Sequence, residues 1–248
     1  MKKFISVLIG IILTVIILIG AMIVGAGYGK YKQAIGDISL VDKVNEVRSS
    51  ETYVNIDDIS DTFKDSIVAI EDIRFYDHGA IEFKSLLRAV LVNLKEKELL
   101  QGGSTITQQV AKNLYFDNDQ NFLKKIAEMF LAFDLEKNYS KDDILELYVN
   151  IIYYGDNNYG IREASNNYFG IEPIDLDYEQ STLLAGLPQA PSSYALGEHY
   201  EEAKERQKQV IEALEKFNAQ KWKDSPRKWR RVHDSREKDL FTQMGKRN

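Results

Sequence analysis

An uncharged apolar run over residues 4–29 constrains the fold of this chain more than any other feature. Its length exceeds the roughly 20 residues that a helix needs to cross a bilayer. A cleaved signal peptide has an apolar core of only about 7–15 residues, so we expect an uncleaved transmembrane helix. The positive-inside rule barely chooses an orientation, because Lys2 and Lys3 precede the run while Lys30 and Lys32 follow it. Most of the chain follows the run, which is typical of a signal anchor whose main domain lies outside the cytoplasm.

The charge distribution separates an acidic body from a basic tail. Residues 29–218 carry 20 Lys and Arg against 34 Asp and Glu, a net charge of −14, whereas residues 219–248 carry 10 against 4, a net charge of +6. An acidic body has to bind an anionic substrate through local cations and not through its overall field. The tail contains Trp222 and Trp229, and we expect either a disordered extension or a segment that binds an anionic lipid or polymer. There is no cysteine, so the body has to fold around its core without disulfides.

The residue spacing in the body predicts helices and no sheet. The four prolines stand at 173, 188, 191 and 226, so residues 62–172 lack the commonest helix breaker. Ser140 and Asp143 form a capping box that opens a helix. Apolar residues recur at helical spacing on both sides of Ser140, at Leu123, Ile126, Ala127, Phe130 and Phe133 and at Ile144, Leu145, Tyr148, Val149 and Ile152. We therefore predict an all-α chain, divided into a cytoplasmic start with the anchor (1–28), a polar stalk (29–61), the main domain (62–218) and the tail (219–248).

Three polar motifs in the main domain carry residues suited to catalysis. In the first, Glu71 and Asp72 are followed by Phe75 and His78. Adjacent carboxylates beside an apolar wall predict a carboxyl pKa raised toward the range that general acid–base catalysis uses. The alternative that this pattern leaves open is a solvated acidic turn at a helix end.

The second motif follows a pair of glycines. Gly102 and Gly103 let backbone N–H groups approach a ligand closely, and Ser104 or Thr105 can cap a helix whose N-terminus favours anions. The motif therefore predicts a diphosphate-binding site, although an ordinary capped amphipathic helix is the alternative. On that helix a polar stripe consists of Thr105, Gln109 and Lys112, and an apolar stripe suited to the core consists of Ile106, Val110 and Leu114.

The third motif places two lysines within reach of one carboxylate. Lys124 and Lys125 precede Glu128 by four and three residues, a spacing that brings side chains together on a helix surface. Exposed pairs of this kind are common and contribute little to stability, so the pattern alone is weak evidence for function.

The three motifs, in this order and spacing, resemble the family 51 peptidoglycan glycosyltransferases. These are the glycan-polymerising domains of bifunctional penicillin-binding proteins and the monofunctional transglycosylases. The resemblance covers about residues 56–206. It continues through the sequences ILELYVN at 144–150 with Tyr153 and Gly155, YFG at 168–170 and LAGLPQAPS at 184–192.

The resemblance implies a role for each motif residue. Glu71 stands at the position of the general base and Glu128 at the position of the second essential carboxylate. The implied substrate is lipid II, an undecaprenyl-diphosphate-linked disaccharide-peptide, which is polymerised with inversion into β-1,4-linked glycan. No cofactor is obligatory, and a divalent cation (Mg²⁺ or Mn²⁺) near Glu128 is left open. The implied substrate-binding residues are Asp72, Phe75, His78, Ser104, Thr105, Gln109, Lys112, Asn113, Lys124 and Lys125.

The resemblance also implies an architecture and a location. The fold is expected to be lysozyme-like and two-lobed, with a smaller apolar lobe beside the membrane. Residues 84–100 fit that smaller lobe, and a plain core helix fits them equally well. The expected location is the cell membrane, single-pass, with the catalytic domain extracytoplasmic. The expected partners are lipid II, the growing lipid-linked glycan, the membrane, and cell-wall synthesis or division proteins, and we expect no nucleic acid.

The chain departs from the family pattern at three places. Gly79 follows His78 directly and Ala80 stands where glycine is expected, Lys124 replaces the usual arginine, and Ala195-Leu196 replaces a proline. Two S-x-x-K matches fall in the basic tail with no K-T-G after them, so we expect no transpeptidase domain. The alternatives to a glycan polymerase are a lysozyme-like muramidase and a non-catalytic scaffold for wall assembly.

Overall fold

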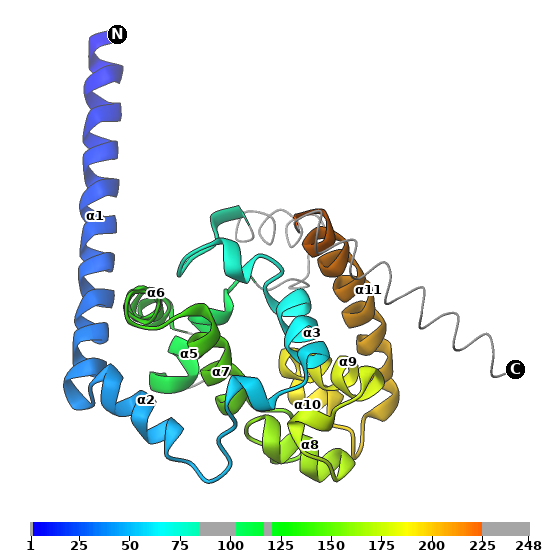
Figure 1. The fold of residues 1–248 in the computed structure, drawn as a ribbon. Coiled ribbons are helices and arrows are strands. Elements are labelled where there is room, and N and C mark those ends of the chain that lie inside the picture. The colour runs from blue at the N-terminus through cyan, green and yellow to red at the C-terminus, as the bar shows by residue number, and fades with distance from the viewer. Residues whose placement is uncertain (1, 85–102, 117–120, 225–248) are drawn as a thin grey trace, which may run out of the picture.

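The computed structural model describes residues 2–84, 103–116 and 121–224 of the chain. These residues form α-helices and short 3-10 helices with no strand, and Tyr153 and Tyr159 pair in one isolated antiparallel bridge. The all-α prediction is confirmed (Figure 1). The helices are α1 (Lys2–Asp37), α2 (Leu40–Arg48), η1 (Ile56–Asp58), α3 (Asp61–Glu71), η2 (Phe75–Asp77), α5 (Ile106–Tyr115), α6 (Phe122–Asn138), α7 (Lys141–Ile151), α8 (Ile161–Phe169), η3 (Pro173–Asp175), α9 (Tyr178–Gly186), η4 (Leu187–Gln189), α10 (Pro191–Tyr194) and α11 (Tyr200–Asp224).

Helix α1 is a candidate membrane anchor. Figure 1 shows that its N-terminal part extends well beyond the body of the molecule, and its apolar side chains there are exposed. By length and composition it can cross a membrane, with a mean hydropathy of 3.2 over its most apolar window. A leucine- and isoleucine-rich surface of this size is stable in lipid and not in water.

The C-terminal part of α1 packs against α6 through a close helix contact. Gly27 allows the approach, because a Cβ at this position would lie 2.6 Å from the Cβ of Ile126. Tyr28 and Tyr31 then pack on Phe130, with ring centroids 5.1 and 5.8 Å away. The anchor is therefore joined to the same helix that carries the third polar motif.

Gly27→Ala is expected to destabilise this contact by about 1–3 kcal/mol, the usual effect of overpacking. Gly25→Ala is the matched control, because a Cβ at Gly25 would have nothing within 4 Å. Thermal unfolding of the full chain in detergent should give a lower Tm for the first variant only. Equal Tm values would show that α1 and α6 are not tightly packed.

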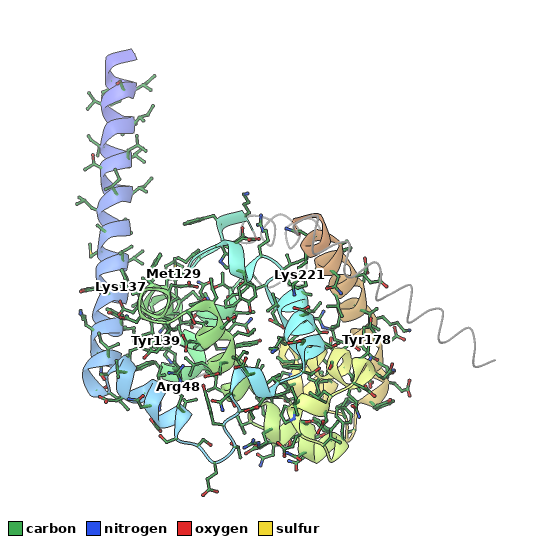
Figure 2. The ribbon with its side chains drawn as sticks, viewed as in Figure 1. Arg48, Met129, Lys137, Tyr139, Tyr178 and Lys221 are labelled. Atoms are coloured by element: carbon green, nitrogen blue, oxygen red, sulfur yellow. The ribbon has the colours of Figure 1, made fainter. Side chains whose placement is uncertain are left out.

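The segment interpreted as a polar stalk contributes to the core. Val54 is buried, and its backbone N–H and C=O each form a 2.8 Å hydrogen bond with the side-chain amide of Asn150 on α7. Glu146 on the same helix accepts a 2.8 Å hydrogen bond from the N–H of Ile56. Figure 2 shows Arg48 of α2 beside Tyr139, with the guanidinium carbon 5.9 Å from the ring centroid. Residues 48–56 are therefore attached to the helical body.

Helix α3 crosses the centre of the body and ends at the first polar motif. It packs against α9 and α11, and its buried face includes Phe63 and Ile67. The predicted capping box of Ser140 and Asp143 is confirmed at the start of α7. Helix α11 continues to Asp224, beyond the predicted end of the main domain, whereas residues 225–248 of the tail and residues 85–100 of the proposed smaller lobe lie outside the described residues.

Candidate active site

Glu71 is the last residue of α3 and is held by α5. Its Oε2 accepts a 2.8 Å hydrogen bond from the amide nitrogen of Gln109. Withdrawal from solvent raises the pKa of the Glu71 carboxyl above its ordinary value; the neighbouring charge of Asp72 adds to the increase, and the Gln109 hydrogen bond and the charge of Arg206 offset part of it. A carboxylate with a raised pKa is a stronger base than an exposed carboxylate with an ordinary pKa.

Gln109 is oriented by a tyrosine behind it. The hydroxyl of Tyr148, which is fully buried on α7, donates to the amide oxygen of Gln109 at 3.3 Å. Because a carboxylate only accepts and the tyrosine supplies the O–H, the amide nitrogen faces Glu71 and the amide oxygen faces Tyr148. The chain Tyr148–Gln109–Glu71 therefore fixes one carboxylate oxygen and leaves the other without a hydrogen-bond partner among the described residues.

Asp72 and His78 connect the first motif to α5. Nε2 of His78 lies 2.7 Å from Oδ1 of Asp72, and Nδ1 lies 2.6 Å from the carbonyl oxygen of Gly79. Both neighbouring oxygens are acceptors, so this geometry favours the doubly protonated, positively charged imidazole. Burial and, less strongly, the repulsion of Lys141 lower the pKa of His78, but the hydrogen bonds to Asp72 and Gly79 and the negative charge of Asp72 together raise it above the ordinary value. Oδ2 of Asp72 accepts a 3.1 Å hydrogen bond from the N–H of Ile106.

The raised pKa predicts that His78 stabilises the fold most in acid. This contribution should be complete below the ordinary imidazole pKa of 6.5 and should be lost as the pH rises through the higher folded-state pKa. The free energy of unfolding of the wild-type chain minus that of His78→Gln should therefore decrease from pH 5.5 to pH 9. His199→Gln serves as the control for losing a histidine elsewhere. A difference that stays constant with pH would refute the charged state of His78.

The start of α5 is occupied by groups of the protein itself. Thr105 and Gln108 form a reciprocal capping box, and the Thr105 hydroxyl donates to the carbonyl of Ala80 at 2.8 Å. The capping prediction is confirmed. The Asp72 carboxylate sits at the first N–H of the helix, where an anion is favoured. The N–H groups of Ile106 and Gln108 are thus already bonded, so these backbone groups do not form the open diphosphate site that the glycine motif suggested.

The side chain of Lys125 joins the second and third motifs. Its ammonium donates to Glu128 Oε2 at 2.8 Å and to the Ser104 hydroxyl at 2.9 Å. Glu128 is buried with 6% of its surface exposed, whereas the side chain of Lys125 is 43% exposed. A buried carboxylate therefore positions a cation that remains accessible.

The other predicted binding residues have different surroundings. Phe75 does not line an open groove as expected, because its side chain is fully buried and its ring lies 4.3 Å from the ammonium of Lys141. Asn113 is exposed, and its amide donates to the backbone carbonyl of Gln109 at 2.8 Å. Lys112, in the last turn of α5, and Lys124, next to Lys125, are both partly exposed.

Ala80, a departure from the family pattern, fits its position without strain. Its side chain is buried with 2% exposed, and the positive-φ residues other than glycine in the described ranges are Asp156 and Asn157. A left-handed backbone, which favours glycine, is therefore not required at Ala80.

The described residues contain no group of three His, Cys, Asp or Glu side chains placed to hold a metal ion. Near Glu128 the charge partner is the ammonium of Lys125. A binding site for a divalent cation usually needs several oxygen ligands, so this donor set does not fit a cation held by the protein alone.

Two buried residues of the site were not predicted. Tyr148 was assigned to the core by helical spacing, and nothing in its spacing indicated the bond to Gln109. Arg206 is buried on α11 and interacts electrostatically with Glu71. Its sequence signal is an arginine in the apolar stripe formed by Ala203, Val210 and Leu214, all of which are buried.

The described residues combine a carboxylate of raised pKa with a cation positioned by a second carboxylate. The two are linked through α5, because Gln109 binds Glu71 while Ser104, just before the helix, binds Lys125. Such a site suits an enzyme that removes a proton from a nucleophile and stabilises an anionic leaving group.

Residues 38–215 match the family described as transglycosylase. The match covers more than half of the chain, so the protein belongs to the transglycosylase family, the family 51 glycosyltransferases with a lysozyme-like domain. The recognition from sequence is confirmed, and the match extends beyond the predicted 56–206 at both ends.

Relatives of two kinds support the assignment. The chain is 35% identical over 185 residues to a monofunctional glycosyltransferase of Staphylococcus aureus (strain JH9), covering 72% of this chain and 68% of the relative. It is 45% identical over 164 residues to penicillin-binding protein 2D of Bacillus subtilis (strain 168), covering 66% of this chain and 24% of the relative. It is 43% identical over 159 residues to penicillin-binding protein 1A of Neisseria flavescens, covering 64% of this chain and 20% of the relative. The chain thus spans about a quarter or less of the length of these penicillin-binding relatives.

Proposed function

We propose that this protein polymerises lipid II, an undecaprenyl-diphosphate-linked disaccharide-peptide, into β-1,4-linked glycan strands of the bacterial cell wall. The observation that carries the proposal is the link through α5 between the base Glu71 and the cation Lys125, held by Glu128. Membership of the transglycosylase family and similarity to a protein named monofunctional glycosyltransferase support the same chemistry.

Glu71 acts as the general base in this mechanism. A sugar hydroxyl is a poor nucleophile, so the free carboxylate oxygen of Glu71 takes its proton as the oxygen attacks the anomeric carbon of the donor. The bond from that carbon to the diphosphate oxygen breaks, and its electron pair leaves with the lipid diphosphate. Direct displacement inverts the anomeric centre, so an α-linked donor gives a β-linked product.

The departing diphosphate needs positive charge more than it needs a proton. Lys125 supplies that charge from a fixed position, and Lys112 and Lys124 are partly exposed on the same two packed helices, α5 and α6. Preorganised cations of this kind stabilise charge that develops in the transition state. A divalent cation would add charge on the diphosphate, and no step of the mechanism requires one.

The candidate anchor supports a location at the cell membrane. In this proposal helix α1 crosses the membrane once and the catalytic domain lies outside the cytoplasm, where the lipid-linked disaccharide and the growing glycan are held at the bilayer surface. Cell-wall synthesis or division proteins are partners consistent with this location, and nucleic acid is not. Protease added to intact wall-stripped cells should digest the body, whereas full protection would reverse the orientation.

Two separate incubations distinguish the proposed function from the two alternatives, a muramidase and a non-catalytic scaffold. The purified full chain receives either the lipid-linked disaccharide or finished glycan strands, and products are resolved by length. We expect longer glycan from the first substrate and no change in the second. Shortening of the strands would indicate a muramidase, and no reaction with either substrate would indicate a scaffold.

A further inference from the structure

Arg206 occupies a position in α11 where an apolar residue is expected. It is 8% exposed, and it lies on the face of the helix that buries Ala203 and Val210. Gly186 at the end of α9 makes room for it, because a Cβ there would come within 3.0 Å of the Arg206 Cγ. The structure therefore accommodates a buried guanidinium at a close contact between α9 and α11.

The hydrogen bonds of Arg206 do not account for its burial. One amino group donates to the side chain of Gln209 at 2.6 Å, but the buried Nε has no hydrogen-bond partner among the described residues. A buried charge without an ionic hydrogen bond is destabilising, and burial lowers the pKa of Arg206 accordingly. A buried group with this cost is therefore a candidate for a role in a functional site.

The carboxylate whose charge acts on Arg206 is that of Glu71. Helix α11 packs against α3, whose last residue is Glu71. The positive charge of Arg206 lowers the pKa of Glu71, and the negative charge of Glu71 offsets part of the decrease that burial causes in the pKa of Arg206. The other groups that act on Glu71 are Asp72 on the same segment and Gln109 on α5. The buried Tyr148 and Tyr154 also lie near Glu71, and burial together with the charge of Glu71 raises their pKa values well above the ordinary value for tyrosine. Among the described residues, Arg206 is thus the one cation whose charge lowers the pKa of Glu71.

We propose that Arg206 is a positioning residue for Glu71, a buried cation behind the base that keeps its carboxylate ionised and ready to accept a proton. The inference rests on the proposed function, in which Glu71 works only when it is deprotonated. Burial and Asp72 both favour the protonated form, and Arg206 opposes them. Long-range attraction suits this role, because a direct ion pair would occupy the oxygen that has to take the proton.

The test is the pH dependence of kcat/KM for lipid-linked disaccharide in the wild type, Arg206→Gln and Arg206→Lys. In Arg206→Gln the base should stay protonated to higher pH, so kcat/KM should fall by roughly tenfold at the acidic end of the profile and approach the wild-type value at the alkaline end. Arg206→Lys retains the charge and should restore most of the acidic activity. Lys208→Gln, which removes an exposed cation from the same helix, should leave the profile unchanged.

A structural role would give a different result. Loss of packing alone would lower activity equally at every pH, and this outcome would overturn the proposal. A second readout does not depend on turnover: a carboxyl carbon NMR titration of the full chain in micelles, with the Glu71 signal assigned by its loss in Glu71→Gln. Its midpoint should move to higher pH in Arg206→Gln, and an unchanged midpoint would refute the inference even if the wild-type chain proved inactive as a polymerase.

Discussion

Replacing Glu71 with glutamine is expected to slow glycan polymerisation by roughly 10²-fold or more, the usual contribution of a general base. Glutamine keeps the size of the side chain and can still accept the hydrogen bond that Gln109 donates. The variant should therefore fold normally and bind the lipid-linked disaccharide, while kcat decreases. The measurement is the initial rate of polymer formation at saturating substrate.

The matched control is Glu215→Gln, which neutralises an exposed carboxylate on α11. It should polymerise at the wild-type rate, and both variants should unfold at the same temperature as the parent within a few degrees. If Glu71→Gln kept most of its activity, the base would have to be another residue.

Lys125→Ala is expected to lower kcat by about 10²–10³-fold, by analogy with the loss of one group that stabilises the transition-state charge. The change removes the cation that we propose faces the leaving diphosphate, and it leaves the buried Glu128 without its 2.8 Å ion pair. An unpaired buried carboxylate is costly, so the thermal stability should fall as well.

Two further variants test whether a positive charge is needed at residue 125 in particular. One keeps the charge at that position, and the other removes a charge elsewhere on the same helix. Lys125→Arg keeps a cation at the position where the lysine contacts Ser104 and Glu128, so it should retain much more activity than the alanine variant. Lys137→Ala removes an exposed lysine from the last turn of the same helix and should have no effect on kcat. Equal activity of Lys125→Ala and Lys137→Ala would move the diphosphate site elsewhere on the domain.

Local sequence rules predicted the parts of the site that depend on neighbours in the chain. The capping residue Thr105, the capping box at Ser140 and the three-residue spacing of Lys125 and Glu128 all describe contacts within one helix turn. The buried stripe of α5 with Val110 is of the same kind, since it depends only on helix periodicity. Such contacts are encoded by spacing and need no knowledge of the tertiary fold.

Contacts between distant segments were not predictable in this way. Asp72 binds the N-terminus of α5 although 34 residues separate it from Ile106, and this contact occupies backbone groups that the glycine motif left available for diphosphate. The buried ring of Phe75 lies in the hydrophobic core and against Lys141, from another helix. The charge of Arg206 reaches Glu71 only because α11 packs on α3. Each of these results follows from helix packing, which residue spacing alone does not determine.

In the proposed mechanism Glu71 assists direct displacement of a lipid diphosphate by a sugar hydroxyl. The most direct test is the configuration of the new glycosidic bond formed by the wild-type chain from an α-linked lipid donor, read from the anomeric proton coupling in the product, together with the amount of lipid diphosphate released. We expect β-linked glycan and one lipid diphosphate released per bond formed. An α-linked product, or lipid diphosphate released without new bonds, would contradict it.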